Sequence, residues 1–162
     1  MRHLNLQSLN TEKCQNAFKD RYKLLPGDFS ESDNVWLAES NGSLFVVKKV
    51  PRRSAGEVAT LQILDHPNIC RLIEVVGSDE YLYLVMEHCA GGDLFHYISE
   101  SNGLDEVSCR KIIRQIASAL NFLHNLDISH GDVKLEKLVD CCWSFNSILV
   151  AAWLTRIRYR LN

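Results

Sequence analysis

The 162-residue sequence lacks the features that mark several common classes of protein. Its 18 basic and 20 acidic residues nearly balance, and the resulting net charge of −2 argues against a general nucleic-acid-binding protein. The apolar run Ser147–Leu154 holds only about eight residues, well below the ~20 that a membrane span needs. The chain does not open with a basic segment followed by an apolar one, so we expect no secretion signal. It contains no internal repeat and no low-complexity tract.

The six cysteines also lack the paired spacing of a metal site. No Cys-x-x-Cys pair occurs among them, so a zinc site is the less favoured interpretation. Scattered thiols of this kind are typical of reduced proteins, and we expect an intracellular protein, either cytoplasmic or nuclear. The cysteines are Cys14, Cys70, Cys89, Cys109, Cys141 and Cys142.

Short β-rich runs follow a polar N-terminal extension of about 20 residues. Apolar residues make up 46% of the chain, which indicates a globular protein. Turn residues separate the runs, and Asn41-Gly42 is a strong hairpin signal. Pro51 leads into a helix expected over Ser54–Leu64. The expected strands are Tyr22–Leu25, Asn34–Ala38, Leu44–Val50, Arg71–Val76 and Tyr81–Glu87.

A long amphipathic helix is expected from Asp105, which has the side chain of an N-cap, to about His124. Basic residues lie opposite an apolar stripe, which predicts a buried scaffold helix. The loop His130–Val139 follows this helix. The stripe consists of Cys109, Ile112, Ile113, Ile116, Ala117, Leu120 and Leu123.

Several motifs, in the correct order over about residues 22–140, resemble serine/threonine protein kinases of the eukaryotic type. Met86-Glu-His-Cys-Ala-Gly-Gly-Asp-Leu-Phe-His-Tyr-Ile is similar to the kinase hinge and the helix after it, nearest to calmodulin-dependent and AMP-activated kinases. His130-Gly-Asp-Val-Lys resembles the catalytic loop, whose usual form is His-Arg-Asp-Leu-Lys-x-x-Asn.

The resemblance implies an α+β fold of the protein kinase type. We expect a five-stranded antiparallel sheet and one helix in the N-lobe, followed by a partial helical C-lobe. The expected organisation is an extension over 1–20, the N-lobe and hinge over 21–89, the partial C-lobe over 90–154 and a basic tail over 155–162.

On this resemblance, Lys48 of Phe45-Val-Val-Lys would contact the α- and β-phosphates of ATP and pair with a helix glutamate. Glu57, nine residues before His66-Pro-Asn-Ile, is the candidate partner. A second interpretation remains open, because Ser54-x-x-Glu57 is also a capping box.

The same resemblance implies an adenine site with apolar walls at Val35, Val46 and Val139. The backbone of Glu87–Cys89 would bond adenine, and Met86 would be the gatekeeper. The Gly-rich loop is degraded, because its three glycine positions are Asp28, Ser30 and Asp33. Acidic side chains there oppose anionic phosphates, so an acidic hairpin turn is favoured over a working phosphate clamp.

Asp132 and Lys134 are the candidate catalytic residues, as proton acceptor and phosphate contact. His130 is expected to be a packed core histidine. The resemblance also implies that both magnesium ligands of the family are missing. Lys137 stands in place of the asparagine, and Ala152-Trp153-Leu154 stands in place of Asp-Phe-Gly. An alternative is that residues 141–162 come from an altered reading frame.

These observations favour a truncated kinase-like protein that is catalytically inactive, binds ATP weakly and acts through a protein partner. Magnesium binding is the doubtful element of such a site. An alternative is an active kinase that transfers the γ-phosphate of ATP to serine or threonine of a protein substrate. A third is a shortened product without a stable fold, because part of the 105–124 stripe would be uncovered.

Overall fold

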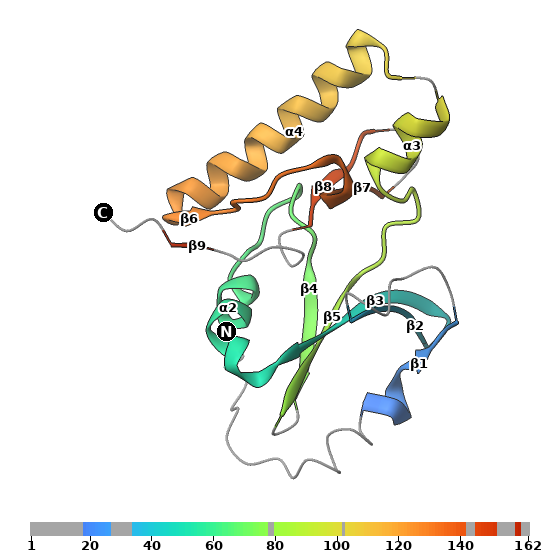
Figure 1. The fold of residues 1–162 in the computed structure, drawn as a ribbon, viewed down its shortest axis with the longest axis vertical. Helices are drawn as coiled ribbons and strands as arrows, with labels where there is room; N and C mark the ends of the chain where they lie inside the picture. The colour runs from blue at the N-terminus through green and yellow to red at the C-terminus, as the bar shows by residue number, and fades with distance from the viewer. Residues whose placement is uncertain are drawn as a thin grey trace. The chain divides into compact units, whose positions relative to one another are not determined.

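The structure, a computed structural model, describes residues 18–26, 34–77, 80–101, 103–141, 145–151 and 158–159 (Figure 1). These residues divide into two compact units. The first holds the described parts of Met1–Ala59 and Leu72–His88, and the second holds those of Thr60–Arg71 and Cys89–Asn162. The expected α+β class is confirmed, because the first unit contains a sheet and the second is mainly helical.

The first unit is built on a five-stranded sheet in the order β1-β2-β3-β5-β4, and every neighbouring pair is antiparallel. The β2–β3 hairpin turns at Asn41 and Gly42, whose φ angles of 51° and 75° suit a two-residue turn. The predicted hairpin and five strands are therefore confirmed. The strands are β1 Lys23–Leu24, β2 Val35–Ser40, β3 Ser43–Pro51, β4 Leu72–Gly77 and β5 Tyr81–Glu87.

The strand register shows which side chains share a face of this sheet. Lys48 lies opposite Val35 on β2 and opposite Leu84 on β5. Directly opposed residues point to the same face, and residues two apart on a strand do so as well. We call this side the lysine face, and it carries Val35, Val46, Lys48, Leu84 and Met86.

The opposite side, which we call the aromatic face, is covered by the helical residues 18–21 and by Tyr22. The Phe18 ring stacks on Tyr22 and on Tyr83, with centroid distances of 5.3 and 4.5 Å. Ala38, Val47 and Val85 are each fully buried beneath these rings. The N-terminal helix therefore completes the core on one side of the sheet.

Pro51 ends β3 and starts a short 3-10 helix, η2 Arg52–Ser54, which leads into α2 Ala55–Gln62. Its φ of −61° is the value that the proline ring imposes, so the residue suits the first turn after a strand. The predicted helix after Pro51 is confirmed, and its regular part begins at Ala55.

The second unit contains α3 Leu94–Ser101 and α4 Glu106–Asn125. Asp105 caps α4 as predicted, because its side chain accepts a hydrogen bond from the Ser108 backbone N–H at 2.9 Å. Short strands follow in two antiparallel pairs. These are β6 Ile128–Ser129 with β9 Arg158–Tyr159, and β7 Leu138–Asp140 with β8 Ile148–Val150.

The predicted apolar stripe of α4 was too wide. Ile112, Ala119 and Leu123 are buried, whereas the Ile113 side chain is 63% exposed and Ala117 is exposed as well. Successive residues on a helix are rotated by about 100°, so Ile112 and Ile113 cannot both face one core. The sequence pattern also missed Ala119.

Residues 60–71 belong to the second unit because the segment after α2 is bonded to β8 and α4. The Asn68 amide donates to Gln115 Oε1 at 3.1 Å and to the Ile148 carbonyl at 3.0 Å. The Asn68 carbonyl accepts the Val150 N–H at 2.9 Å. The segment His66-Pro67-Asn68-Ile69 is therefore bound to α4 and β8 of the second unit by hydrogen bonds of Asn68.

One buried polar contact joins Tyr22 on the aromatic face to strand β4. The Tyr22 hydroxyl donates to Glu74, and Arg21 pairs with the same carboxylate at 2.8 Å. Burial, and then the hydrogen bond to Glu74, raise the pKa of Tyr22 to about 12.

We expect Tyr22→Phe to lower the free energy of unfolding by about 1 kcal/mol at pH 7, because Glu74 loses one donor and keeps Arg21. The folded pKa of about 12 lies above the ordinary value of 10.0, so the wild type keeps this stabilisation below pH 10 and loses it as the pH rises through 12. Urea denaturation should show the difference between wild type and variant shrinking from pH 7 to pH 11. A difference that stays constant would contradict the assignment.

Candidate active site

The lysine face brings together three of the predicted nucleotide-binding residues. Val35 and Val46 are buried, at 4% and 5% exposure, and Lys48 is half-buried beside them. Val46 also lies opposite Met86, the predicted gatekeeper, which is fully buried. A positive charge bordered by flat apolar side chains is suited to a group with both a phosphate and an aromatic ring.

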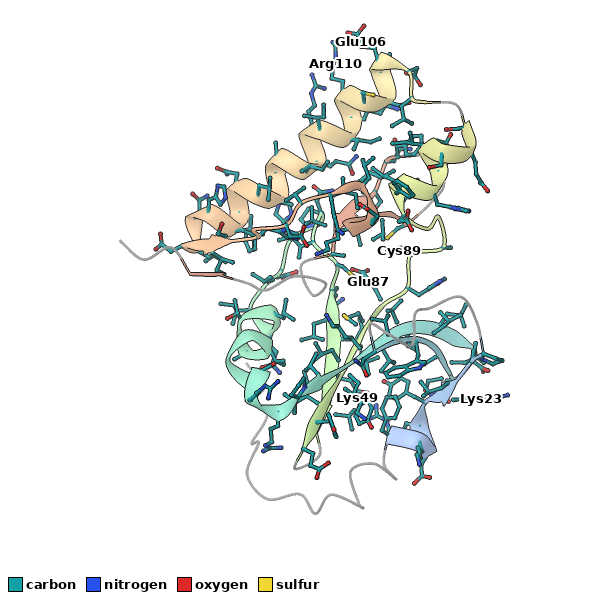
Figure 2. The ribbon with its side chains drawn as sticks, viewed as in Figure 1. Lys23, Lys49, Glu87, Cys89, Glu106 and Arg110 are labelled. Atoms are coloured by element: carbon teal, nitrogen blue, oxygen red, sulfur yellow. The ribbon has the colours of Figure 1, made fainter. Side chains whose placement is uncertain are left out.

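The neighbouring Lys49 belongs to the other side of the sheet. Its Nζ lies 3.8 Å from the centroid of the Tyr81 ring, a cation–π contact on the aromatic face. Figure 2 labels this lysine on β3. Because consecutive residues of a strand alternate, Lys48 rather than Lys49 is on the side with Val35 and Val46.

Glu57 is the third residue of α2, directly after Ser54 and its two successors. Ser54 is the last residue of the 3-10 helix η2, so its backbone is already helical there. The Glu57 side chain, like the predicted Gly-rich-loop positions Asp28, Ser30 and Asp33, lies outside the described residues. The capping box and the pairing with Lys48 therefore both stay predictions.

The hinge-like motif begins at the end of β5 and continues into the second unit. Glu87 ends β5 and pairs with Phe45, and Cys89 is half-buried in the turn that follows (Figure 2). The Gly91 N–H donates to the Asp140 carbonyl at 2.9 Å, and the Asp140 N–H donates to the Gly92 carbonyl at 2.9 Å. This segment is therefore paired with β7 through its backbone.

The two glycines are required by that pairing. A Cβ built on Gly91 would lie only 2.5 Å from the Asp140 carbonyl oxygen, and Gly92 has a φ of +70°. No other side chain fits the first position, and few adopt the second conformation without strain. The two glycines of the hinge-like motif are thus explained by packing within the second unit, without a ligand.

The loop with Asp132 follows β6 and begins with a buried histidine. His130 is 2% exposed, which confirms the expectation of a packed core residue. The Asp132 N–H donates to His130 Nδ1 at 3.4 Å, so the proton of the neutral ring is on Nε2. Nε2 faces the Ala151 backbone without meeting hydrogen-bond geometry among the described residues. Burial, and then the charge of Lys137, lower the pKa of His130.

The Lys137 ammonium forms an ion pair with the Asp132 carboxylate. The Lys137 side chain is only 10% exposed, whereas that of Asp132 is 52% exposed. Lys137 is fixed by the 3-10 helix η3 Leu135–Lys137, and its carbonyl accepts the Ala151 N–H at 2.9 Å. The side chain that replaces the expected asparagine therefore lies against the predicted proton acceptor.

This ion pair stabilises the charged form of Asp132. The hydrogen bond from Lys137 lowers the pKa of Asp132, and the charges of Lys137 and Lys134 act in the same direction. Lys134 is exposed and directly precedes η3. Asp132 is thus an ionised carboxylate whose one short contact is already made with a protein cation.

The last predicted site residue, Val139, is half-buried on β7 and lies opposite Leu149 on β8. Ala152-Trp153-Leu154 lies outside the described residues. Within the described part of the chain, no cluster of three or more His, Cys, Asp or Glu side chains could hold a metal ion.

Comparison with known families gives a match between residues 27–139 and the family described as protein kinase domain. The chain belongs to this family. The kinase match covers strands β2 to β5, the helices α2, α3 and α4 and the Asp132 loop, and it agrees with the motifs found in the sequence.

Curated kinases and one solved structure are similar to most of this chain. Calcium/calmodulin-dependent protein kinase type 1B of Rattus norvegicus is 36% identical over 139 residues, which are 80% of this chain and 40% of that protein. Calcium-dependent protein kinase 5 of Plasmodium falciparum is 32% identical over 81% of this chain and 24% of its own length. The crystal structure of Rad53 1-466 in complex with AMP-PNP has a TM-score of 0.75 at 29% identity, covering 83% of this chain and 38% of that one.

The chain therefore spans about two fifths of the length of the calmodulin-dependent kinases that it matches. The comparisons support a serine/threonine kinase-like protein and the kinase fold. Among the residues that the structure describes, no helix is both long enough and apolar enough to cross a bilayer.

Three structural features of this kinase region were not assigned from the sequence. They are the hydrogen bonds of Asn68, the contact of Gly91 with Asp140 and the ion pair of Lys137 with Asp132. A lysine in place of an expected asparagine could have suggested the third, because Asp132 is five residues away. The other two depend on contacts between distant segments and have no local signal.

We expect Gly91→Ala to lower the free energy of unfolding by about 1–3 kcal/mol, because the added Cβ displaces the backbone of Asp140. Gly56→Ala is the matched control, since nothing lies within 4 Å of a Cβ built on this helical glycine. Alanine also favours a helix over glycine by up to about 1 kcal/mol, so the control should be neutral or more stable. Equal effects of the two variants in urea denaturation would show that the Gly91–Asp140 contact is unimportant.

Proposed function

We propose that this chain is a pseudokinase, a kinase-like protein without phosphoryl transfer, which binds adenine nucleotides weakly and without a metal ion. The observation that carries the proposal is the buried Lys137 ammonium bound to Asp132. We further propose that the chain acts by binding a protein partner, which is how a kinase-like domain without catalysis can regulate others.

The physical argument concerns the cation of the reaction. Kinases hold magnesium with oxygen ligands and neutralise the phosphates with it. An ammonium group cannot donate an electron pair to a metal, and its charge repels one that approaches. Loss of one preorganised electrostatic contact commonly costs ~3 kcal/mol, about a hundredfold in rate, and the second expected ligand position is Ala152.

Lys137 also alters the predicted proton acceptor. Asp132 has its contact with Lys137 and a lowered pKa, so it is a weaker base than an isolated aspartate. Proton abstraction from a substrate hydroxyl depends on that basicity. The same substitution thus opposes two steps of phosphoryl transfer.

Nucleotide binding requires fewer precisely placed groups than phosphoryl transfer does. Val35, Val46 and Lys48 share one face of a well-formed sheet, which supports contact with adenine and with phosphates. The similar Rad53 structure was determined with AMP-PNP, a fact about that protein which motivates the same proposal here. Val139, Glu87 and Cys89 remain proposed adenine contacts.

We expect AMP-PNP to bind purified protein with the same affinity in EDTA as in magnesium, because Lys137 replaces one metal ligand of the family pattern and the described residues contain no cluster of three or more His, Cys, Asp or Glu that could hold the ion. Lys48→Met should weaken binding about 10-fold or more, the usual effect of losing a charged hydrogen bond. Lys49→Met is the matched control, because Lys49 lies on the aromatic face. Isothermal titration calorimetry gives these affinities. Equal losses in both variants, or no binding by the wild type, would refute the nucleotide site.

The second candidate function, an active kinase, is favoured by one observation. Asp132 is retained, ionised and half exposed. An active kinase would transfer the γ-phosphate of labelled ATP to a generic protein substrate, and Asp132→Asn would abolish this transfer.

We expect no such transfer by the wild type, and we expect Lys137→Asn/Ala152→Asp to acquire magnesium-dependent AMP-PNP binding. These substitutions remove the ammonium and restore two oxygen ligands of the family pattern. A cooperative melting transition in each protein controls for folding and also tests the alternative of an unfolded product. Turnover by the wild type that depends on Asp132 would overturn the pseudokinase proposal.

A further inference from the structure

Two cysteines from distant parts of the sequence meet in the second unit. Cys89 Sγ lies 2.7 Å from Cys141 Sγ. A disulfide bond is about 2.05 Å long, so the two sulfur atoms need to approach by only about 0.7 Å to bond. Both side chains are half-buried, which leaves them accessible to a small oxidant.

The backbone, rather than a chance side-chain rotamer, holds this pair together. Residues 91–93 are paired with 139–140 through the two Gly–Asp140 hydrogen bonds and the bridge from Asp93 to Val139. Cys89 closes the turn before this pairing, because its carbonyl accepts the Gly92 N–H at 3.3 Å. Cys141 comes directly after Asp140, and its N–H donates to the Ser147 carbonyl at 3.1 Å.

The other described cysteines lack this arrangement. Cys70 is buried at 7% exposure, and the Cys109 thiol lies 4.0 Å from the Leu104 carbonyl near the start of α4. The pair is thus a specific feature of the turn after β5 and the turn after β7.

We propose that Cys89 and Cys141 form a reversible disulfide when the protein meets a peroxide. One thiolate attacks the peroxide oxygen, breaking the O–O bond, and becomes a sulfenic acid as water leaves. The second thiol then attacks that sulfur, the S–O bond breaks and a second water leaves. Two thiols lose two electrons in total, and one hydrogen peroxide is reduced to two waters.

The bond would tie the hinge-like turn to β7 at a second point beside the Gly91 contact. It would also close a loop between residues that are 52 apart in sequence, which restricts the unfolded chain. Formation of this bond requires neither a bound nucleotide nor catalysis. A thiol-based reductant would reverse it.

The chain permits a clean assignment of the bond. Trypsin cleaves after Arg71, Arg110, Lys137 and Arg156, so the peptide 72–110 holds Cys89 with Cys109, and 138–156 holds Cys141 with Cys142. In the full-length variant Cys109→Ser/Cys142→Ser, each peptide retains one cysteine. Treatment with hydrogen peroxide, alkylation and mass spectrometry then reports on one pair.

We expect a linked 72–110/138–156 peptide that dithiothreitol removes, and a melting temperature raised on the order of 5–10 °C in the oxidised variant. Adding Cys89→Ser should abolish both changes, and its melting under reducing conditions checks that it folds. Oxidation of these cysteines to sulfinic acid without a linked peptide would overturn the proposal. So would a link in the wild type that disappears in Cys142→Ser.

Discussion

An ion pair between Lys137 and Asp132 is the constraint on which the chemistry of this molecule depends. The Lys137 ammonium lies against Asp132, the carboxylate that would accept the proton of a substrate hydroxyl in the kinase pattern. Lys137 itself stands at a position where that pattern has a metal ligand. Lys137 is nearly buried, and removing such a charge from water is costly without a partner. Asp132 supplies that partner while it remains half exposed. The aspartate therefore has a structural role in this chain in addition to any chemical one.

The lysine at position 137 bears differently on nucleotide binding and on phosphoryl transfer, two properties that most kinases combine. Recognition of a purine relies on the sheet, where alternation along β2 and β3 puts Val35, Val46 and Lys48 on one face. The opposite face is covered by Phe18 and Tyr22. Val35, Val46 and Lys48 lie in the first unit, whereas Asp132 and Lys137 lie in the second, so the replacement at position 137 leaves those three residues unchanged.

Local patterns in the sequence predicted most of the fold. Asn41-Gly42 specifies a tight hairpin, Asp105 caps α4, and the β-rich runs became the five strands, because each signal depends on neighbours in the chain. The stripe on α4 was predicted too wide, since spacing alone does not say whether Ile112 or Ile113 faces the core. Asn68 was missed altogether, because its partners Gln115 and Ile148 are 47 and 80 residues away. For the site, resemblance identified the positions, but only the structure showed that Lys137 reaches Asp132.

The best preserved motif illustrates how resemblance and function differ. Met86 to Ile98 matches the kinase hinge closely, which by itself suggests a working nucleotide site. Yet Gly91 is fixed by the carbonyl of Asp140, and Asp140 is in turn buried with its carboxylate accepting the Phe145 N–H at 3.0 Å. These contacts would preserve the glycines even in a protein that never bound ATP. The proposal of nucleotide binding therefore rests on Lys48, which shares a face of the sheet with Val35 and Val46, more than on the hinge motif.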